Sequence, residues 1–282
     1  MDMKVAEVMT PDPVCAIVPG TREELFELIR ESGKTSFPVT KGKNGDLIGI
    51  VTETDIVNKR SETQIALLMT KNPQTVTLDT KVSEVVKILI ENNFRQMPVM
   101  KKNKLVGMID IGDIISKVVS IDTSKKTIEN YMGEDIMGIW QETPVYICQH
   151  LMKIGKAESA LIFNNDLDMV GIITNVDFIN VFESQLSENR SEMSSGEGKE
   201  GSWDSVSTII VQTKDLSLPK YPVKELMTTN VITTFKKATL NAVAKKIHRM
   251  KLYQIPVVDA KGNVIGMIRD VDLLLAYFND ND

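Results

Sequence analysis

The sequence has few of the residues that build disulfide frameworks, metal centres and catalytic dyads. Its 282 residues include two cysteines and two histidines. Cys15 and Cys148 have no metal-ligand spacing, so we expect both to be small buried hydrophobic residues. His150 and His248 lie on separate predicted helices, and no Ser–His or Cys–His pair has a catalytic pattern. We therefore expect a protein that is not an enzyme and that holds no metal and no catalytic cofactor.

Long apolar runs and an excess of positive charge are missing as well. No stretch approaches the roughly 20 apolar residues of a membrane span, and the first residues contain no apolar signal segment. The formal net charge of −5 argues against nucleic acid and anionic membranes as partners. Hydrophobic residues make up 42% of the chain, which is enough for substantial cores. These features predict a cytoplasmic protein with no nucleic-acid and no membrane partner.

The sequence does contain one segment that is written four times. Each copy begins with a glycine and ends six residues later with an aspartate, and a methionine followed by a small residue precedes the glycine by 38 to 40 residues. Spacing this regular indicates an array of one structural unit. The copies are Gly49-Ile-Val-Thr-Glu-Thr-Asp55, Gly107-Met-Ile-Asp-Ile-Gly-Asp113, Gly171-Ile-Ile-Thr-Asn-Val-Asp177 and Gly266-Met-Ile-Arg-Asp-Val-Asp272, preceded by Met9, Met69, Met132 and Met227.

The fourth copy gives the clearest secondary-structure pattern. Apolar residues with helical spacing follow Thr239, a predicted helix N-cap, and short apolar runs with strand character flank the glycine segment. The predicted order is strand, helix, strand, strand, helix. The elements are strand 231–234, helix 240–250, strands 255–259 and 264–268, and helix 272–278.

The other copies follow the same order with local differences. In the first, Thr21 and Glu24 form a predicted capping box at the start of a helix. In the third, Thr143 is a predicted N-cap and Pro144 the first helical residue. The third copy also has Ser159-Ala-Leu161 where the others have a proline and a valine.

The repeats divide the chain into units that are too small to be comfortably stable alone, so we expect them to pair. A polar stretch rich in glycine, serine and glutamate, residues 183–205, predicts a flexible tether, with a regulatory or partner-binding role as the open alternative. Residues 206–212 behind it predict an extra strand. The predicted divisions are units 1–60, 61–122, 123–185 and 218–282, with the insert at 186–217.

The Met-Thr turn, the x-Pro-Val strand and the final Gly-x-x-Thr-x-x-Asp segment resemble those of CBS domains. The resemblance covers nearly the whole chain apart from the insert. It implies an α/β (α+β) fold of four β-α-β-β-α units that pair into two Bateman modules. The four units of one chain could close into a disc, or modules from two chains could pair in a homodimer.

The same resemblance implies a ligand site in the cleft between paired units, where a threonine and an aspartate of the final segment hold a ribose. An ionised aspartate can accept both hydrogen bonds of a vicinal diol. We expect one good site per module, although an aspartate at a helix start is also an ordinary N-cap. The ribose candidates are Thr52 with Asp55 and Thr174 with Asp177; the secondary candidates are Asp113 and Asp272, because Asp110 and Arg269 stand in the threonine position.

Phosphate ligands are implied in the segment before the x-Pro-Val strand and near helix N-termini, which favour anions. A solvated surface charge is the structural alternative for each basic residue, and plain core for each apolar one. The phosphate candidates are Arg95, Lys34, Lys156 and Arg269, and the base-packing candidates are Phe37, Val76, Met97, Leu161, Ile232 and Ile255.

The implied function is that of a stand-alone regulatory protein. It would bind AMP, ADP or ATP between paired units and thereby change the activity of an unknown protein partner. Two alternatives remain open: a scaffold without ligand, and a sensor of S-adenosylmethionine, whose sulfonium suits acidic surroundings such as Asp110.

Overall fold

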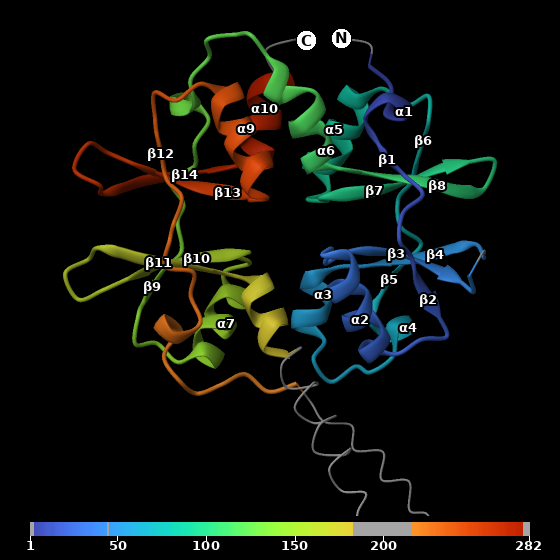
Figure 1. The fold of residues 1–282 in the computed structure, drawn as a ribbon, viewed down its shortest axis with the longest axis horizontal. Coiled ribbons are helices and arrows are strands. Elements are labelled where there is room, and N and C mark those ends of the chain that lie inside the picture. The colour runs from blue at the N-terminus through green and yellow to red at the C-terminus, as the bar shows by residue number, and fades with distance from the viewer. Residues whose placement is uncertain (1–2, 44, 183–215, 279–282) are drawn as a thin grey trace, which may run out of the picture.

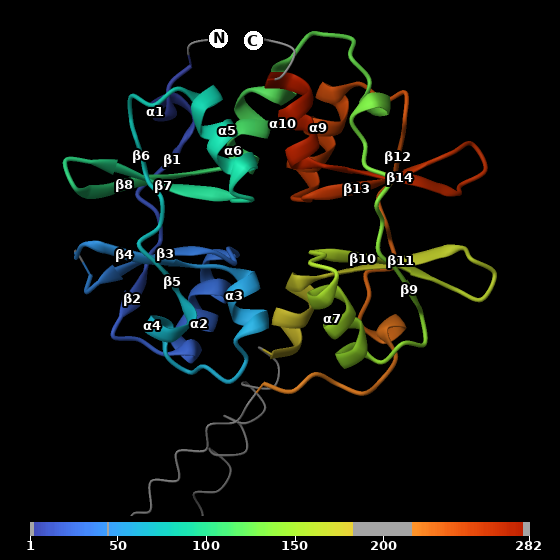
Figure 2. The same ribbon diagram turned by 180° about the vertical axis from the view of Figure 1, so that it is seen from behind.

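The computed structural model describes residues 3–43, 45–182 and 216–278. Four small sheets lie in two tiers, with their helices on the outer side of each tier, so that the molecule forms a disc (Figures 1 and 2). The sheets of the first and second units face each other on one side of the disc, and those of the third and fourth units on the other. Most of the predicted insert 186–217, including the expected strand 206–212, lies outside the described residues.

The first unit has the predicted order of elements. Parallel pairing joins its first two strands, and an antiparallel hairpin follows. The capping box predicted at Thr21 is confirmed, because its side chain accepts a hydrogen bond from the backbone N–H of Glu24. The elements are β2 (Ala16–Val18), α2 (Arg22–Ser32), β3 (Phe37–Lys41), β4 (Leu47–Val51) and α3 (Glu53–Asn58).

The second unit repeats this order. Its sheet has the same parallel and antiparallel pairings, and a 3-10 turn extends its last helix. The elements are β6 (Val76–Thr77), α5 (Val82–Glu91), β7 (Gln96–Lys101), β8 (Lys104–Asp110), α6 (Ile111–Lys117) and η1 (Val119–Ile121).

The third and fourth units correct two details of the prediction. Pro144 is the N-cap of α7 (Val145–Ile154) and not its first helical residue. The strand expected at 231–234 is reduced to β12 (Thr234–Phe235). The remaining elements are β9 (Gly138–Trp140), β10 (Ser159–Phe163), β11 (Met169–Thr174) and the helical residues 175–182 in the third unit, and α9 (Leu240–Met250), β13 (Gln254–Val258), β14 (Val264–Arg269) and α10 (Asp270–Phe278) in the fourth.

Paired units exchange their leading segments. The segment around Met9 forms α1 (Val5–Val8) and β1 (Thr10–Pro11), and β1 pairs with β8 of the second unit. In return, α4 (Ile65–Leu68) leads into β5 (Thr70–Lys71), which pairs with β4 of the first unit. A division at 60/61 therefore separates the two units along the sequence, whereas in space each unit is completed by a segment from its partner.

The second module exchanges segments in the same way. Gly133, just after η2 (Ile128–Asn130), bridges to Met267 of the fourth unit. Thr228, just after η3 (Val223–Glu225), bridges to Ile172 of the third unit. The methionine and glycine of the sequence repeat are thus two halves of one interlocking contact between neighbouring units.

Two hydrophobic cores hold the disc together, and each is shared between the modules. One joins buried residues of α5 and α6 in the second unit to those of α9 and α10 in the fourth. The other joins α2 and α3 in the first unit to α7 and the helical residues 175–182 in the third. Figure 1 shows these helices side by side at the top and the bottom of the disc. Because both cores cross the module boundary, one chain closes the disc by itself.

Candidate functional site

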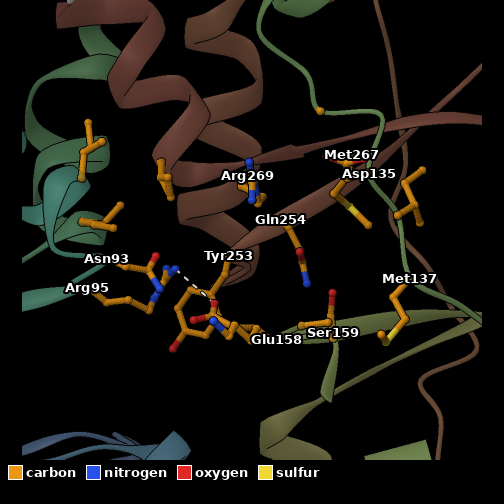
Figure 3. Close-up of a pocket in the computed structure, with 18 of the residues that line it drawn as sticks. Asn93, Arg95, Asp135, Met137, Glu158, Ser159, Tyr253, Gln254, Met267 and Arg269 are labelled. Carbon is orange, nitrogen blue, oxygen red and sulfur yellow. Dashed lines mark ion pairs between the residues drawn. The ribbon is translucent and has the colours of Figure 1, made fainter. Parts of the chain in front are cut away.

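A cavity of about 540 Å³ opens near the centre of the disc, where the second, third and fourth units meet. Its walls come from the end of α5, from the connection 133–137, from the segment between α7 and β10, and from β13 and β14. Figure 3 shows Arg95 entering from the second unit, Tyr253 and Arg269 from the fourth, and Glu158 and Met137 from the third.

Repeat-equivalent positions supply the side chains at the centre. In every unit the residue that ends the first long helix has a positive φ, between 52° and 64°, which turns the chain towards the disc axis. Two residues later comes a side chain that faces the other units. The left-handed residues are Gly33, Asn93, Lys156 and Lys251, and the side chains that follow are Thr35, Arg95, Glu158 and Tyr253.

Arg95 connects three units through its guanidinium group. It forms an ion pair with the buried carboxylate of Asp270 in the fourth unit. A second carboxylate, that of Glu158 in the third unit, lies 3.6 Å away. The Arg95 guanidinium carbon also lies 4.4 Å from the centroid of the Tyr253 ring, which is a cation–π geometry. The first unit joins this cluster through Glu53, which interacts electrostatically with Arg95 and Glu158 and accepts a hydrogen bond from the Thr35 hydroxyl at 2.9 Å.

The cluster gathers the carboxylates of Asp270, Glu158 and Glu53 around Arg95, and Arg269 also interacts electrostatically with Asp270 and Glu158. Asp270 is 2% exposed, and this burial raises the pKa of its carboxyl group to about 6, against the opposing effect of the Arg95 cation. Burial also raises the pKa of Glu53, and the negative charge of Glu158 adds to that effect. Carboxylates of the first, third and fourth units thus interact with one guanidinium of the second unit at the centre of the disc.

The aspartates of the repeated segment sit at the third helical position and not at the N-cap. Thr52 is the N-cap of α3, and its backbone N–H and hydroxyl both donate to Oδ2 of Asp55, at 3.1 and 2.8 Å. Thr174 and Asp177 repeat this pairing at 2.7 and 3.0 Å. In both pairs the two threonine groups use the same carboxylate oxygen, which leaves Oδ1 available for another donor.

The four aspartates differ in which group donates a hydrogen bond to the other carboxylate oxygen, Oδ1. In Asp55 it accepts from Lys59 Nζ at 3.1 Å, and in Asp113 from the hydroxyl of Thr10 at 3.0 Å. In Asp177 no side chain of the described residues pairs with it. Burial raises the pKa of both Asp113 and Asp177.

Asp272 is fully engaged by Arg269, which replaces the threonine. Its Oδ2 accepts from the backbone N–H of Arg269 at 2.8 Å and from Nε at 3.1 Å. Its Oδ1 accepts from Nη2 at 3.0 Å. The Asp272 side chain is 6% exposed, whereas that of Arg269 is 55% exposed and lines the cavity.

The cavity brings together three of the four predicted phosphate ligands. Arg95, Lys156 and Arg269 all line it, and so do the acidic residues Asp135 and Glu158. Lys34 is exposed and does not line it. None of the ribose candidates lines the cavity. These are Thr52, Asp55, Thr174 and Asp177, with Asp113 and Asp272 as the secondary candidates.

Of the base-packing candidates, Leu161 lines the cavity. The others belong to the cores: Phe37, Val76, Met97 and Ile255 are buried, and Ile232 packs partly buried against the core of the second and fourth units. Leu161 is itself fully buried, so the apolar surface offered to a ligand comes instead from residues such as Phe94, Ile136 and Met137.

Sequence reasoning missed the acidic half of the central cluster. Glu158 could have been found, because it occupies the same repeat position as Arg95 and Tyr253. Asp270 and Glu53 share another repeat position, the first residue of the closing helix. No local pattern distinguishes them from ordinary acidic residues in a first helical turn, which helix dipoles favour anyway.

Comparison with known proteins identifies the repeat. The family model for the CBS domain matches residues 5–62, 64–120 and 223–279. The chain belongs to the CBS-domain family. The third unit, outside these three ranges, has the same order of strands and helices.

Two archaeal proteins have similar sequences. Uncharacterized protein MJ0188 of Methanocaldococcus jannaschii is 37% identical over 133 residues, which are 46% of this chain and 49% of that protein, so the match spans about half of either. Protein MJ1225 of the same organism is 22% identical over 298 residues and covers 97% of this chain and 99% of its own.

Two solved structures share the fold over nearly the whole chain. That of MJ1225, described as a proposed archaeal homologue of γ-AMPK, has a TM-score of 0.81 at 18% identity and covers 98% of this chain and all of its own. An uncharacterized conserved protein from Pyrococcus horikoshii has a TM-score of 0.64 at 24% identity, covering 97% and 99%. The predicted fold of four paired CBS units is thereby confirmed.

Among the described residues, no helix is long and apolar enough to cross a membrane. Their histidine, cysteine, aspartate and glutamate side chains form no group of three or more that could hold a metal ion.

Proposed function

We propose that this CBS protein is a regulatory sensor that binds an adenosine-containing ligand in the central cavity. The observation that carries the proposal is the composition of the cavity wall: Arg95, Lys156 and Arg269 provide positive charge, and Phe94, Ile136 and Met137 provide apolar surface. A nucleotide has this combination of an anionic group and an apolar, planar base. Small-molecule sites commonly combine apolar surface with polar groups that fix the orientation of the ligand.

Among AMP, ADP and ATP, the charges favour the monophosphate. Arg95 is already paired with Asp270, and Arg269 with Asp272. Lys156 alone among the three lining cations has no side-chain partner within the described residues. A triphosphate would have to compete with two buried carboxylates for its cations, and separating a buried ion pair is costly.

Ligand binding would act on a partner protein through Arg95. Arg95, the end of α5 and Ile111 belong to the first module, whereas the rest of the cavity wall belongs to the second module. An anion that draws the guanidinium away from Glu158 changes a contact between modules, and a difference in affinity between two arrangements is what shifts a population. A regulatory role agrees with the description of MJ1225 as a proposed γ-AMPK homologue.

The test is a calorimetric titration and thermal-shift panel with AMP, ADP, ATP, NAD and S-adenosylmethionine. A ligand that binds only the folded state raises the melting temperature by mass action. We expect AMP to give the largest shift and Lys156→Gln to weaken its binding about tenfold, as for loss of one charge-assisted hydrogen bond. Lys153→Gln, an exposed lysine of α7 outside the cavity, is the matched control and should change nothing.

The same panel separates the competing functions. Asp135 and Glu158 on the cavity wall favour the sulfonium of S-adenosylmethionine, so tighter binding of that ligand would make it the second candidate. Loss of one binding site in Asp55→Ala or Asp177→Ala would place additional ribose contacts at these aspartates. A folded sample, free of co-purified nucleotide, that binds none of these ligands would overturn the sensor and favour a scaffold.

A further inference from the structure

The ion pair between Arg95 and Asp270 connects a buried group to the cavity. Asp270, the first residue of α10, is 2% exposed and does not line the cavity. Arg95 does line it, and its side chain is 29% exposed. A ligand that binds the guanidinium from the cavity therefore changes the surroundings of a carboxylate that it does not touch.

The groups that act on Asp270 come from several elements around the centre of the disc. Arg95 is its ion-pair partner, and the backbone N–H of Val271 donates to its Oδ1 at 2.8 Å. The other charged or titratable side chains that interact with it electrostatically are Glu158, Tyr253 and Arg269. Glu53 acts on the same cluster through Arg95 and Glu158.

Glu158 places a negative charge on the cavity side of this arginine. Its carboxylate lies 3.6 Å from Nη1 of Arg95, whereas Asp270 is paired with Nη2. From there its charge raises the pKa of Asp270, because a nearby like charge favours the protonated form of a carboxyl group. The acidic group of a ligand at Arg95 acts in the same direction. A phosphate monoester does so more strongly, since it carries about −1.5 to −2 charges at pH 7.

We propose that the binding of an acidic ligand at Arg95 is coupled to the uptake of a proton from solvent by Asp270. The inference deepens the proposed function and rests on it, because it concerns the regulation of the same cavity. The ligand binds on the exposed side of the guanidinium and the proton on its buried side. Protonation removes the negative charge that competes with the ligand for Arg95, so each of the two favours the binding of the other.

This coupling makes the affinity for the ligand depend on pH. Burial raises the pKa of Asp270 to about 6 in the free protein, and the bound anion raises it further. The gain in affinity is therefore complete well below pH 6 and is lost as pH rises through the pKa of the bound state. For a further rise of about one unit, the affinity should fall about fivefold between pH 6 and pH 8.

The experiment measures AMP binding to the full chain by isothermal titration calorimetry from pH 6 to pH 8, in the wild type, Asp270→Asn and Asp135→Asn. Asparagine at position 270 does not titrate, so the fivefold change should disappear in that variant. The ratio of the two affinities at each pH cancels the titration of the phosphate of AMP itself. Asp135→Asn is the matched control, because Asp135 lines the cavity but lies outside the ion pairs of Arg95. Its pH dependence should match that of the wild type.

A second readout needs no substitution and therefore holds even if Asp270→Asn does not fold. Titrations of the wild type at pH 7 in two buffers of different ionisation enthalpy count the protons exchanged, and we expect an uptake of about 0.3–0.4 per AMP. AMP binding without proton uptake, or with the same pH dependence in Asp270→Asn, would overturn the inference and leave the proposed function standing. No binding of AMP at any of these pH values would overturn both.

Discussion

At the scale of single residues, the centre of the disc is defined by a charge that is only partly compensated. Asp270 is buried and paired with Arg95, yet burial outweighs the attraction and raises the pKa of its carboxyl group to about 6. Glu158 adds further negative charge near the same arginine. We expect this arrangement to respond to protons and to anions, because either one changes the net charge around the Arg95 guanidinium.

We predict that Asp270 makes the stability of the protein depend on pH between about 4 and 6. The folded pKa of about 6 lies above the ordinary value of 3.8, so in this window the folded state holds more of the proton than the unfolded state. The free energy of unfolding contributed by this group therefore falls as pH rises from about 4 to about 6 and is constant above.

Denaturant unfolding of the wild type and Asp270→Asn at several pH values measures this effect. The stability of the wild type relative to the variant should decrease across the window, because the asparagine does not titrate. Comparison with the variant cancels the exposed carboxylates whose pKa is lowered, such as Asp79 and Asp259. A relative stability that is flat, or that rises with pH, would contradict the assigned pKa.

At the scale of elements, the methionine and the glycine that recur in each repeat of this chain pack against each other. A Cβ atom on Gly107 would lie 2.6 Å from Sδ of Met9 and 2.9 Å from the carbonyl oxygen of Thr10. On Gly49 it would meet Met69 and Thr70 at the same distances. The glycine is thus required for the close approach of the exchanged segment, not for an unusual φ.

We predict that Gly107→Ala destabilises the protein by about 1–3 kcal/mol, the usual cost of overpacking. The added methyl group must displace the backbone of β1 as well as a flexible thioether, and β1 joins the two units of the first module. Thermal or denaturant unfolding measures the change.

Gly112→Ala is the control within the same unit. Gly112 is exposed on α6, and its nearest non-neighbouring atom is a carboxylate oxygen of Asp110, which is 3.2 Å from an added Cβ. Improved helix propensity should offset this contact, so the change should cost no more than about 0.5 kcal/mol. Equal losses from both substitutions would show that the Met–Gly contact has no special role.

Most elements could be predicted from sequence because their signals are local. The apolar spacing specifies α9, although Thr239 at its N-cap position makes no side-chain capping hydrogen bond, and the capping box specifies the start of α2. The start of α7 was predicted one residue early, because a threonine before a proline is compatible with either helix start. The exchange of β1 and β5 has no local signal, since these strands have only two residues each.

At the scale of the whole molecule, the modules are coupled by cores that neither of them completes alone. One core combines helices of the first and third units, and the other combines helices of the second and fourth units. Arg95 adds a polar link from the second unit to the third and fourth. We therefore expect the disc to respond as one body when the central contacts change.

We predict that Arg95 and Asp270 are energetically coupled across the module boundary. Arg95→Gln leaves a buried carboxylate without its cation, which should cost about 3 kcal/mol or more where that carboxylate is ionised. Asp270→Asn in addition should recover part of this loss. A double-mutant cycle, measured by denaturant unfolding at pH 8, should give a coupling energy of about 0.5–3 kcal/mol.

Lys4 and Asp79 provide the reference pair, with both side chains more than half exposed at 2.9 Å. Surface pairs contribute little, so a cycle on these residues should give a coupling near zero. Additive effects of the Arg95 and Asp270 substitutions would mean that their contact does not couple the modules.

The repeat and the order of elements in each unit could be predicted from the sequence alone, because they follow from local periodicity and from spacing along the chain. Which side chains meet depends on the tertiary structure. Exchange of the leading segments, closure of the disc and the meeting of Arg95, Glu158 and Asp270 join residues up to 175 positions apart. Such contacts depend on how four similar surfaces pack, and no single unit carries that information.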